Sequence, residues 1–243
     1  MTHIHRGDDL LEGDCLVRDC ISEHMRENAG VRTALARLST QGKEKVREVE
    51  GIALDAGSDN DLRLEAIALV LAMKQDSTQF LARLLDADDK FIIVETLKRI
   101  REFATDWAVP ELISRVKKTS DSSVRAIFAW ALAGYPNNAE VRDALLELIK
   151  RDSDAAVRDH ALESLGAFRS PVVVDALLGV LDHGSANERF WSLYSLGTLG
   201  DDRAVDAISR CLEDHTKIPD FGTISAEAKW ALESIAKRTR DFI

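Results

Sequence analysis

The sequence predicts an all-α fold, a right-handed α-solenoid of about six helical hairpins with helical caps. One phrase recurs along the chain at intervals of roughly thirty residues, and such a period indicates stacked helical repeats. Ala, Leu, Glu and Arg, which all favour helix, dominate the composition, and only four of the 243 residues are Pro. A chain of this length can bury a substantial core.

The repeated phrase is clearest at 118–135 (KTSDSSVRAIFAWALAGY) and 151–168 (RDSDAAVRDHALESLGAF), and looser at 185–199. In the two clear copies an Asp lies four residues before an Arg, and that Arg opens an apolar segment. Positions three, seven and ten after it are almost always apolar in every copy, so they form one face of a helix. We call the residue at position zero the anchor; the six anchors are Arg63, Lys90, Arg125, Arg158, Arg189 and Ser225.

Another amphipathic segment precedes each anchor segment, as in DWAVPELISRV and AEVRDALLELIK. The repeating unit is therefore a hairpin of a first and a second helix. An Asp four residues before an anchor can accept hydrogen bonds from free backbone N–H groups at the start of the second helix. We predict such N-caps at Asp59, Asp86, Asp121 and Asp154.

The phrases DSSVRAIFAWALAG at 121–134 and DAAVRDHALESLGA at 154–167 resemble the HEAT family, and within it the short repeats first named for phycobilin lyases. The resemblance covers about 41–243, which we expect to be the solenoid domain, and 1–40 is expected to be an N-terminal helical cap or a degenerate repeat. Lys90 and Ser225 depart from the family pattern. The resemblance implies a ladder of acidic and basic side chains between neighbouring repeats, here Asp59, Arg63, Asp121, Arg125, Asp154 and Arg158.

The same resemblance implies that the second helices line the concave face of the solenoid. Positions one and five of these helices lie away from the apolar stripe and are normally polar, but several are aromatic in this chain. Large aromatic side chains on a wet face are informative, because Trp and Tyr are enriched in binding hot spots. The rings could instead fill gaps between repeats. The predicted partner-binding set is Phe91, Glu95, Trp130, Asp159, Glu163, Phe190, Tyr194 and Trp230.

Catalytic and metal-binding patterns are weak. None of the six His is followed by Glu, as in the di-iron sites that helical-repeat hydroxylases carry. Cys15, Cys20 and His24 form the one cluster with ligand chemistry, but Cys15 would point away from the other two on a helix, so a tetrahedral site would need another ligand. We expect no metal, no cofactor and no enzymatic activity.

The net charge of −10 disfavours a phosphate backbone as partner, and the one basic run, LKRIRE at 97–102, is interpreted as a solvated helix face. A partner with a basic and partly apolar surface fits better. No apolar run is long enough to cross a membrane, and the N-terminus does not resemble a signal peptide. Three Cys indicate a reducing compartment, so we expect a cytoplasmic protein with neither a membrane nor a nucleic acid as its partner.

These observations predict a non-enzymatic protein that clamps another protein in its concave face. A concrete version is an immunity or antitoxin-type inhibitor of a basic toxin, because HEAT-like proteins of this length resemble some of those. The alternative of a different class is a phycobilin-lyase-like enzyme or lyase subunit, for which coexpression with bilin and an acceptor protein should give colour. A nucleic-acid binder is a third possibility, which a salt-dependent shift of labelled DNA or RNA would reveal.

Overall fold

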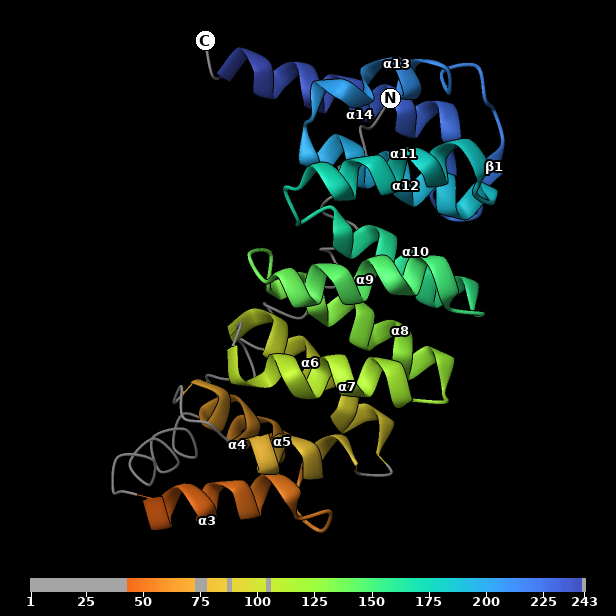
Figure 1. The fold of residues 1–243 in the computed structure, drawn as a ribbon. Coiled ribbons are helices and arrows are strands. Elements are labelled where there is room, and N and C mark those ends of the chain that lie inside the picture. Colours follow the sequence, from red (N-terminus) through yellow and green to blue (C-terminus); the bar gives the residue numbers. More distant parts are fainter. Residues whose placement is uncertain (1–42, 73–77, 87–88, 104–105, 242–243) are drawn as a thin grey trace. The chain divides into compact units, whose positions relative to one another are not determined.

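The computed structural model describes residues 43–72, 78–86, 89–103 and 106–241 (Figure 1). The chain forms two compact units that divide between Gln75 and Asp76. The predictions for 1–40, including Cys15, Cys20 and His24, lie outside the described residues. Within the described part, no helix combines the length and the apolar character that a membrane span requires.

In the first unit, the described residues form one helical hairpin of α3 (Lys43–Leu54) and α4 (Asn60–Ala72). Asp59 caps α4, because its Oδ1 accepts the backbone N–H of Asp61 at 2.9 Å, as predicted. Val49 and Ile67 are fully buried in the hairpin core. The Arg63 side chain is buried as well, and its Nε donates to the Ala53 carbonyl at 3.3 Å.

The described residues of the second unit form five hairpins that follow one another in chain order (Figure 1). The predicted all-α solenoid is confirmed. Short 3-10 turns η1 (Asp106–Ala108), η2 (Leu132–Gly134) and η3 (Asp202–Ala204) lie between helices. The hairpins are α5 (Thr78–Leu85) with α6 (Lys90–Phe103), α7 (Val109–Lys118) with α8 (Ser122–Ala131), α9 (Ala139–Arg151) with α10 (Ala155–Leu165), α11 (Pro171–His183) with α12 (Ala186–Leu199), and α13 (Val205–Ser209) with α14 (Ile224–Asp241).

The loop before α14 contains a small β-hairpin, β1 (Lys217–Ile218) and β2 (Gly222–Thr223). The strands are antiparallel, with Lys217 opposite Thr223 and Ile218 opposite Gly222. Asp220 in the turn has a φ of 66°, a left-handed conformation that Asp tolerates better than most residues. Ile218 is buried, which fixes the β-hairpin against the rest of the unit.

The apolar stripe of the second helices forms the core of the second unit, as the periodicity predicts. Every residue at positions three, seven and ten from Lys90 onward is at most 7% exposed, except Leu232, which is half-buried. These buried residues are Ile93, Leu97, Ile100, Phe128, Leu132, Tyr135, Ala161, Leu165, Phe168, Ser192, Leu196, Leu199, Ala228 and Ile235.

Consecutive second helices from α8 to α14 pack against one another much more closely than consecutive first helices do. Small side chains permit this approach. The Ser164 hydroxyl donates to the Ala129 carbonyl at 3.0 Å, and the Ser195 hydroxyl donates to the Leu162 carbonyl at 2.7 Å. A Cβ added to Gly197 would lie only 2.7 Å from the Ala231 Cα. The second helices therefore form the more closely packed layer of the second unit.

Helix caps follow the prediction at two further repeats and depart from it at one. Asp121 caps α8 and Asp154 caps α10, each through backbone N–H groups two and three residues later. The predicted cap at Asp86 is wrong. Asp89 takes that place, because α6 begins at Lys90 and the Ile92 N–H donates to Asp89 Oδ1 at 3.2 Å. Asp86 follows the end of α5 directly and pairs instead with Arg115 of α7.

Candidate protein-binding surface on the second helices

Five consecutive second helices, from α6 to α14, place one aromatic or acidic side chain each at position five. None of these residues is buried: four are half-buried, and Trp230 is 36% exposed. From α6 to α10 these side chains alternate between a carboxylate and an aromatic ring, and on α12 and α14 both are aromatic. We call this set the position-five row; its members are Glu95, Trp130, Glu163, Tyr194 and Trp230.

The three predicted residues at position one have different surroundings. Phe91 on α6 is 49% exposed, and Asp159 on α10 is half-buried. The prediction that Phe190 is exposed is wrong, because it is only 2% exposed. The ring of Phe221, which the β-hairpin carries, lies 5.5 Å from the Phe190 ring, and Trp191 packs edge-on at 5.4 Å. Phe190 therefore packs beneath the exposed residues and is not part of the surface.

At the C-terminal end of the row, Tyr194 and Trp230 stack almost in parallel, with ring centroids 5.5 Å apart and an interplanar angle of 7°. Trp191 is 8% exposed and lies edge-on to Tyr194 at 5.8 Å. These rings fill the space between α12 and α14, so this part of the row also has the packing role that the sequence left open. Trp230 nevertheless keeps more than a third of its surface accessible.

Trp130 carries a cation. The guanidinium carbon of Arg101, at the end of α6, lies 4.0 Å from the centre of the Trp130 ring, which is cation–π geometry. Close packing of α6 against η2 makes this possible, since a Cβ on Gly134 would lie 2.9 Å from the Arg101 carbonyl oxygen. The sequence interpretation of 97–102 as a solvated face missed this contact, and a basic residue near the end of a second helix is the one signal that could have suggested it.

The carboxylates of the row differ in how they are compensated. Glu95 pairs with Lys98 at 2.8 Å and lies 3.7 Å from Arg99, both on its own helix. Glu163 has its Oε2 3.3 Å from the His160 Nδ1. Within the described residues, no Lys or Arg forms a salt bridge with Glu163 or Asp159.

Asp159 is the most perturbed acid on this face. Its Oδ1 atom is buried and has no hydrogen-bond partner among the described residues. Burial, followed by the negative charge of Glu188, raises the pKa of Asp159 to about 6, although a hydrogen bond from Asn187 acts in the opposite direction. Burial, and then the charge of Glu163, also raises the pKa of Tyr194.

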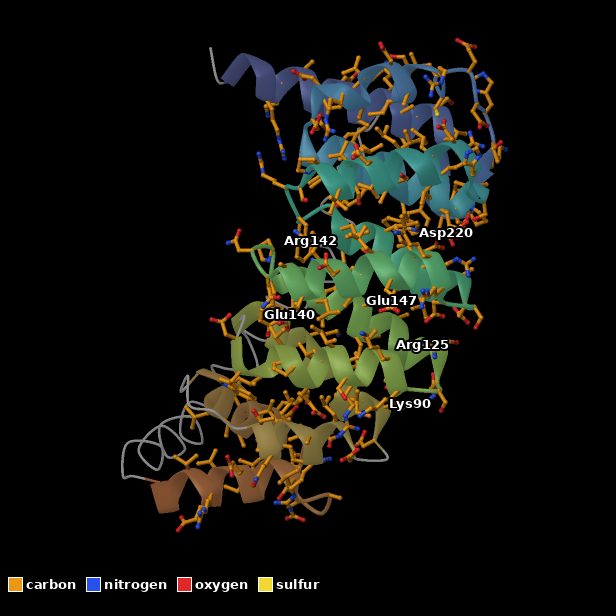
Figure 2. All side chains as sticks on the ribbon, in the orientation of Figure 1. Lys90, Arg125, Glu140, Arg142, Glu147 and Asp220 are labelled. Atoms are coloured by element: carbon orange, nitrogen blue, oxygen red, sulfur yellow. The ribbon has the colours of Figure 1, made fainter. Side chains whose placement is uncertain are left out.

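The predicted ladder exists, but most of its acids differ from the predicted ones. Each anchor in the second unit from Lys90 to Arg189 pairs with an acid of the following repeat, and Figure 2 labels two of these anchors, Lys90 and Arg125. Asp121 takes part as predicted, with Lys90 as its partner. The pairs are Lys90–Asp121, Arg125–Asp152 at 2.7 Å, Arg158–Glu188 at 2.6 Å and Arg189–Asp214.

Asp154 contacts the preceding repeat as predicted, but it does not form the salt bridge with Arg125. Its carboxylate caps α10 and also forms a hydrogen bond with Ser122, so Arg125 turns to Asp152, which lies at the end of α9. Arg63 and Asp59 make their described contacts within the first unit, where Arg63 also donates to Asn60 at 3.2 Å.

Other clefts of the second unit offer little chemistry. A cleft of about 700 Å³ lies between α5, α6, α7 and α8. Two of its cations, Lys90 and Arg115, are paired with Asp121 and Asp86, and Lys118 is a third. Among the described residues, no group of three or more His, Cys, Asp or Glu could hold a metal ion. The half-exposed position-five row, with Phe91 and Asp159, remains the best-developed candidate surface.

Comparison with known proteins places repeats in the same region. Residues 109–196 and 142–219 match the family model of HEAT repeats. No curated protein matches the chain. Solved structures that are similar include an engineered protein, with 18% identity, 86% of this chain and 97% of that one covered, and a TM-score of 0.45. Another is a designed armadillo repeat protein in complex with the peptide (KR)4, with 14% identity, 87% and 94% covered, and a TM-score of 0.40. The narrower resemblance to phycobilin-lyase repeats stays a prediction.

Proposed function

We propose that this HEAT-repeat scaffold is a non-enzymatic binding protein that clamps a partner protein on the position-five row together with Phe91 and Asp159. One observation supports this most directly. Five neighbouring second helices present an aromatic or acidic side chain at the same repeat position, and none of the five is buried. Repeat scaffolds of this kind commonly bind proteins along an extended face.

The aromatic members can supply affinity. Phe91 and Trp230 are among the few large apolar side chains of the described residues that are clearly exposed, at 49% and 36%. Trp and Tyr bury a large area at a small entropic loss, since each has only two side-chain torsions. Helices hold these rings in place, so a partner would not have to order them on binding.

The acidic members can supply selectivity. Asp159 and Glu163 lie one turn apart on α10, and the whole chain carries a net charge of −10. A negative surface steers a positively charged protein toward it and speeds association. The partner that fits has a basic surface with apolar patches. In its most specific form, the proposal is an immunity or antitoxin-type inhibitor that covers the basic active surface of a toxin such as a nuclease.

Affinity capture from a lysate of the source organism tests this proposal. We expect wild type to retain a basic protein that the Trp130→Ala, Trp230→Ala variant loses. A matched control replaces two exposed apolar residues that lie outside the second helices, Val172 at 57% and Leu212 at 36% exposure, with Ala. This control should capture as wild type does. Circular dichroism would confirm that all variants remain helical.

Two outcomes would contradict the proposal. Equal capture by wild type and the double Trp variant would place binding on another surface. A captured partner whose activity is unchanged by saturating amounts of the purified protein would refute the inhibitor form while leaving the binding role intact.

A further inference from the structure

Building on the proposed function, we propose that the surface from Trp130 to Trp230 recognises arginine side chains of the partner in preference to lysine. Three groups carry the argument: the Trp130 ring, the pair of carboxylates on α10 and the Tyr194–Trp230 stack. Each offers a guanidinium an interaction that an ammonium group makes less well.

The first group already binds a guanidinium. Arg101 brings its Cζ atom to 4.0 Å from the Trp130 ring centre. A planar, weakly hydrated cation stacks on an aromatic face more readily than the compact, strongly hydrated ammonium of Lys. Arg101 occupies one face of Trp130, and the half-buried ring keeps part of its surface accessible to a partner.

The carboxylates of Asp159 and Glu163 form the second group. Asp159 and Glu163 are both half-buried, and no Lys or Arg of the described residues forms a salt bridge with either carboxylate, although Glu163 Oε2 lies 3.3 Å from the His160 Nδ1. Arg158, their neighbour on α10, is held by Glu188 at 2.6 Å. A guanidinium has five N–H donors in a fixed fork that can serve two acceptors at once, which suits a pair of acids one helical turn apart.

The third group is the Tyr194–Trp230 stack. One face of Trp230 is covered by Tyr194, while 36% of its surface stays accessible. The hydroxyl of Ser195, the residue after Tyr194, lies 3.3 Å from the Glu163 carbonyl oxygen, so the residue that carries this acid neighbours the helix of the stack. A guanidinium stacked on the Trp230 ring would also be attracted by the negative charge of Glu163. The stack and this acid would then act together on one arginine.

The spacing of the helices suggests how such residues are arranged in a partner segment. Packed helices lie roughly 8–10 Å apart, a distance that about three residues of polyproline II chain cover, and side chains three residues apart on such a chain point the same way. One arginine in every third position would therefore meet successive second helices. Three labelled peptides of four Gly-Gly-Xaa units, with Arg, Lys or Glu as Xaa, make suitable probes.

Fluorescence anisotropy at about 0.15 M ionic strength, where the Debye length is about 8 Å, measures their binding. We expect the Arg peptide to bind about tenfold more tightly than the Lys peptide, and the Glu peptide not to bind. The Asp159→Asn, Glu163→Gln variant should lose about tenfold in affinity for the Arg peptide, and its preference over Lys should fall to about twofold.

The matched control is Asp143→Asn, Glu147→Gln on α9, which removes the same charges at the same spacing from a first helix; Figure 2 labels Glu147. Both side chains are well exposed, at 62% and 46%. This variant should stay within about twofold of wild type, because net charge alone is screened over such distances.

Three results would overturn the inference: equal affinity for the Arg and Lys peptides, equal losses in both double variants, or no binding of the Arg peptide up to about 1 mM. None of them would refute the proposed function, because capture of a partner that depends on Trp130 and Trp230 is measured separately. A captured partner whose binding shows no preference for arginine would support the proposed binding function and refute the arginine selectivity.

Discussion

The guanidinium of Arg125 donates two hydrogen bonds to the carboxylate of Asp152 in the following repeat. Nε donates to Oδ2 at 2.7 Å, and Nη2 donates to Oδ1 at 2.9 Å. The remaining nitrogen, Nη1, donates to the Thr119 carbonyl at 2.7 Å. Both charged side chains are largely shielded from water, at 13% and 8% exposure. This bidentate pair is the best-formed contact of the ladder.

Asp152→Asn should therefore lower the free energy of unfolding by roughly 2–3 kcal/mol at pH 7, since it leaves a buried guanidinium without its counter-charge. Urea denaturation would measure the loss. Asp175→Asn, which affects an acid that is 65% exposed, should change stability by less than about 0.5 kcal/mol. Equal effects of the two substitutions would show that the buried geometry is unimportant.

The same pair predicts a pH dependence. The hydrogen bond from Arg125 lowers the pKa of Asp152 from its ordinary value of 3.8, so the folded chain holds this proton less tightly than the unfolded chain does. The contribution to stability is present above pH 3.8 and is lost as the pH falls through the lower, folded pKa. The difference between wild type and Asp152→Asn should shrink below about pH 4 in acid titrations of unfolding.

Asp159 should behave in the opposite way. Its pKa is raised from 3.8 to about 6, so its contribution to stability is greatest below pH 3.8 and falls as the pH rises through about 6. Asp159→Asn should raise the free energy of unfolding by roughly 1 kcal/mol at pH 7.5, a value reduced to allow for the partial exposure of the side chain. Urea denaturation at pH 7.5 and pH 4 checks this.

At pH 4 the substitution should have little effect, because the wild-type carboxyl is then largely neutral in the folded state. The groups around Asp159 are Glu188 and Asn187 from α12 and Arg158 and His160 from its own helix. A loss of stability at pH 7.5 would mean that the carboxylate is better compensated than this arrangement indicates.

Two helical glycines offer a sharp comparison. A Cβ on Gly197 of α12 would lie 2.7 Å from the Ala231 Cα and 2.8 Å from the Trp230 ring, so Gly197→Ala should destabilise the fold by about 1–3 kcal/mol. Gly179 of α11 has no such neighbour within 4 Å, so Gly179→Ala should stabilise it by about 0.5–1 kcal/mol. Thermal unfolding followed by circular dichroism would give opposite signs, and a neutral Gly197→Ala would mean that α12 and α14 are less closely packed.

Tryptophan fluorescence reports on the exposed end of the row. Trp230 is 36% exposed and Trp191 only 8%, so Trp230→Phe should remove the largest share of the emission that acrylamide can quench. Trp191→Phe is the control and should remove mainly protected emission. A quenchable fraction that survives Trp230→Phe unchanged would show that Trp230 is covered in solution and would count against the proposed surface.

The sequence predicts those features that depend on local periodicity. The buried stripe of the second helices follows from the spacing of apolar residues, and the caps at Asp121 and Asp154 follow from an acid placed before a helix. The Asp86 prediction fails because a shift of three residues in the start of α6 transfers the cap to Asp89. Element boundaries of this kind depend on packing that a single sequence does not display.

Features that depend on distant segments could not be predicted. Phe190 is buried by Phe221, which reaches it only because the β-hairpin folds back on α12. Arg101 finds Trp130 in the next repeat, and the choice of Asp152 over Asp154 depends on where α9 ends. The half-exposed positions of the row were predictable from their place on the helix. The residues that contact them from other repeats were not.

Every ladder pair of the second unit runs in the same sense, from a cation in one repeat to an acid in the next. The stack therefore has a polarity, and its two directions are chemically different. Splitting the chain between α8 and α9 would leave the bare guanidinium of Arg125 at the edge of the leading fragment and the bare carboxylate of Asp152 at the edge of the trailing one. The two new ends carry opposite charges, so they attract each other. Two copies of the same end would repel, and the fragments should therefore reassemble in the original order.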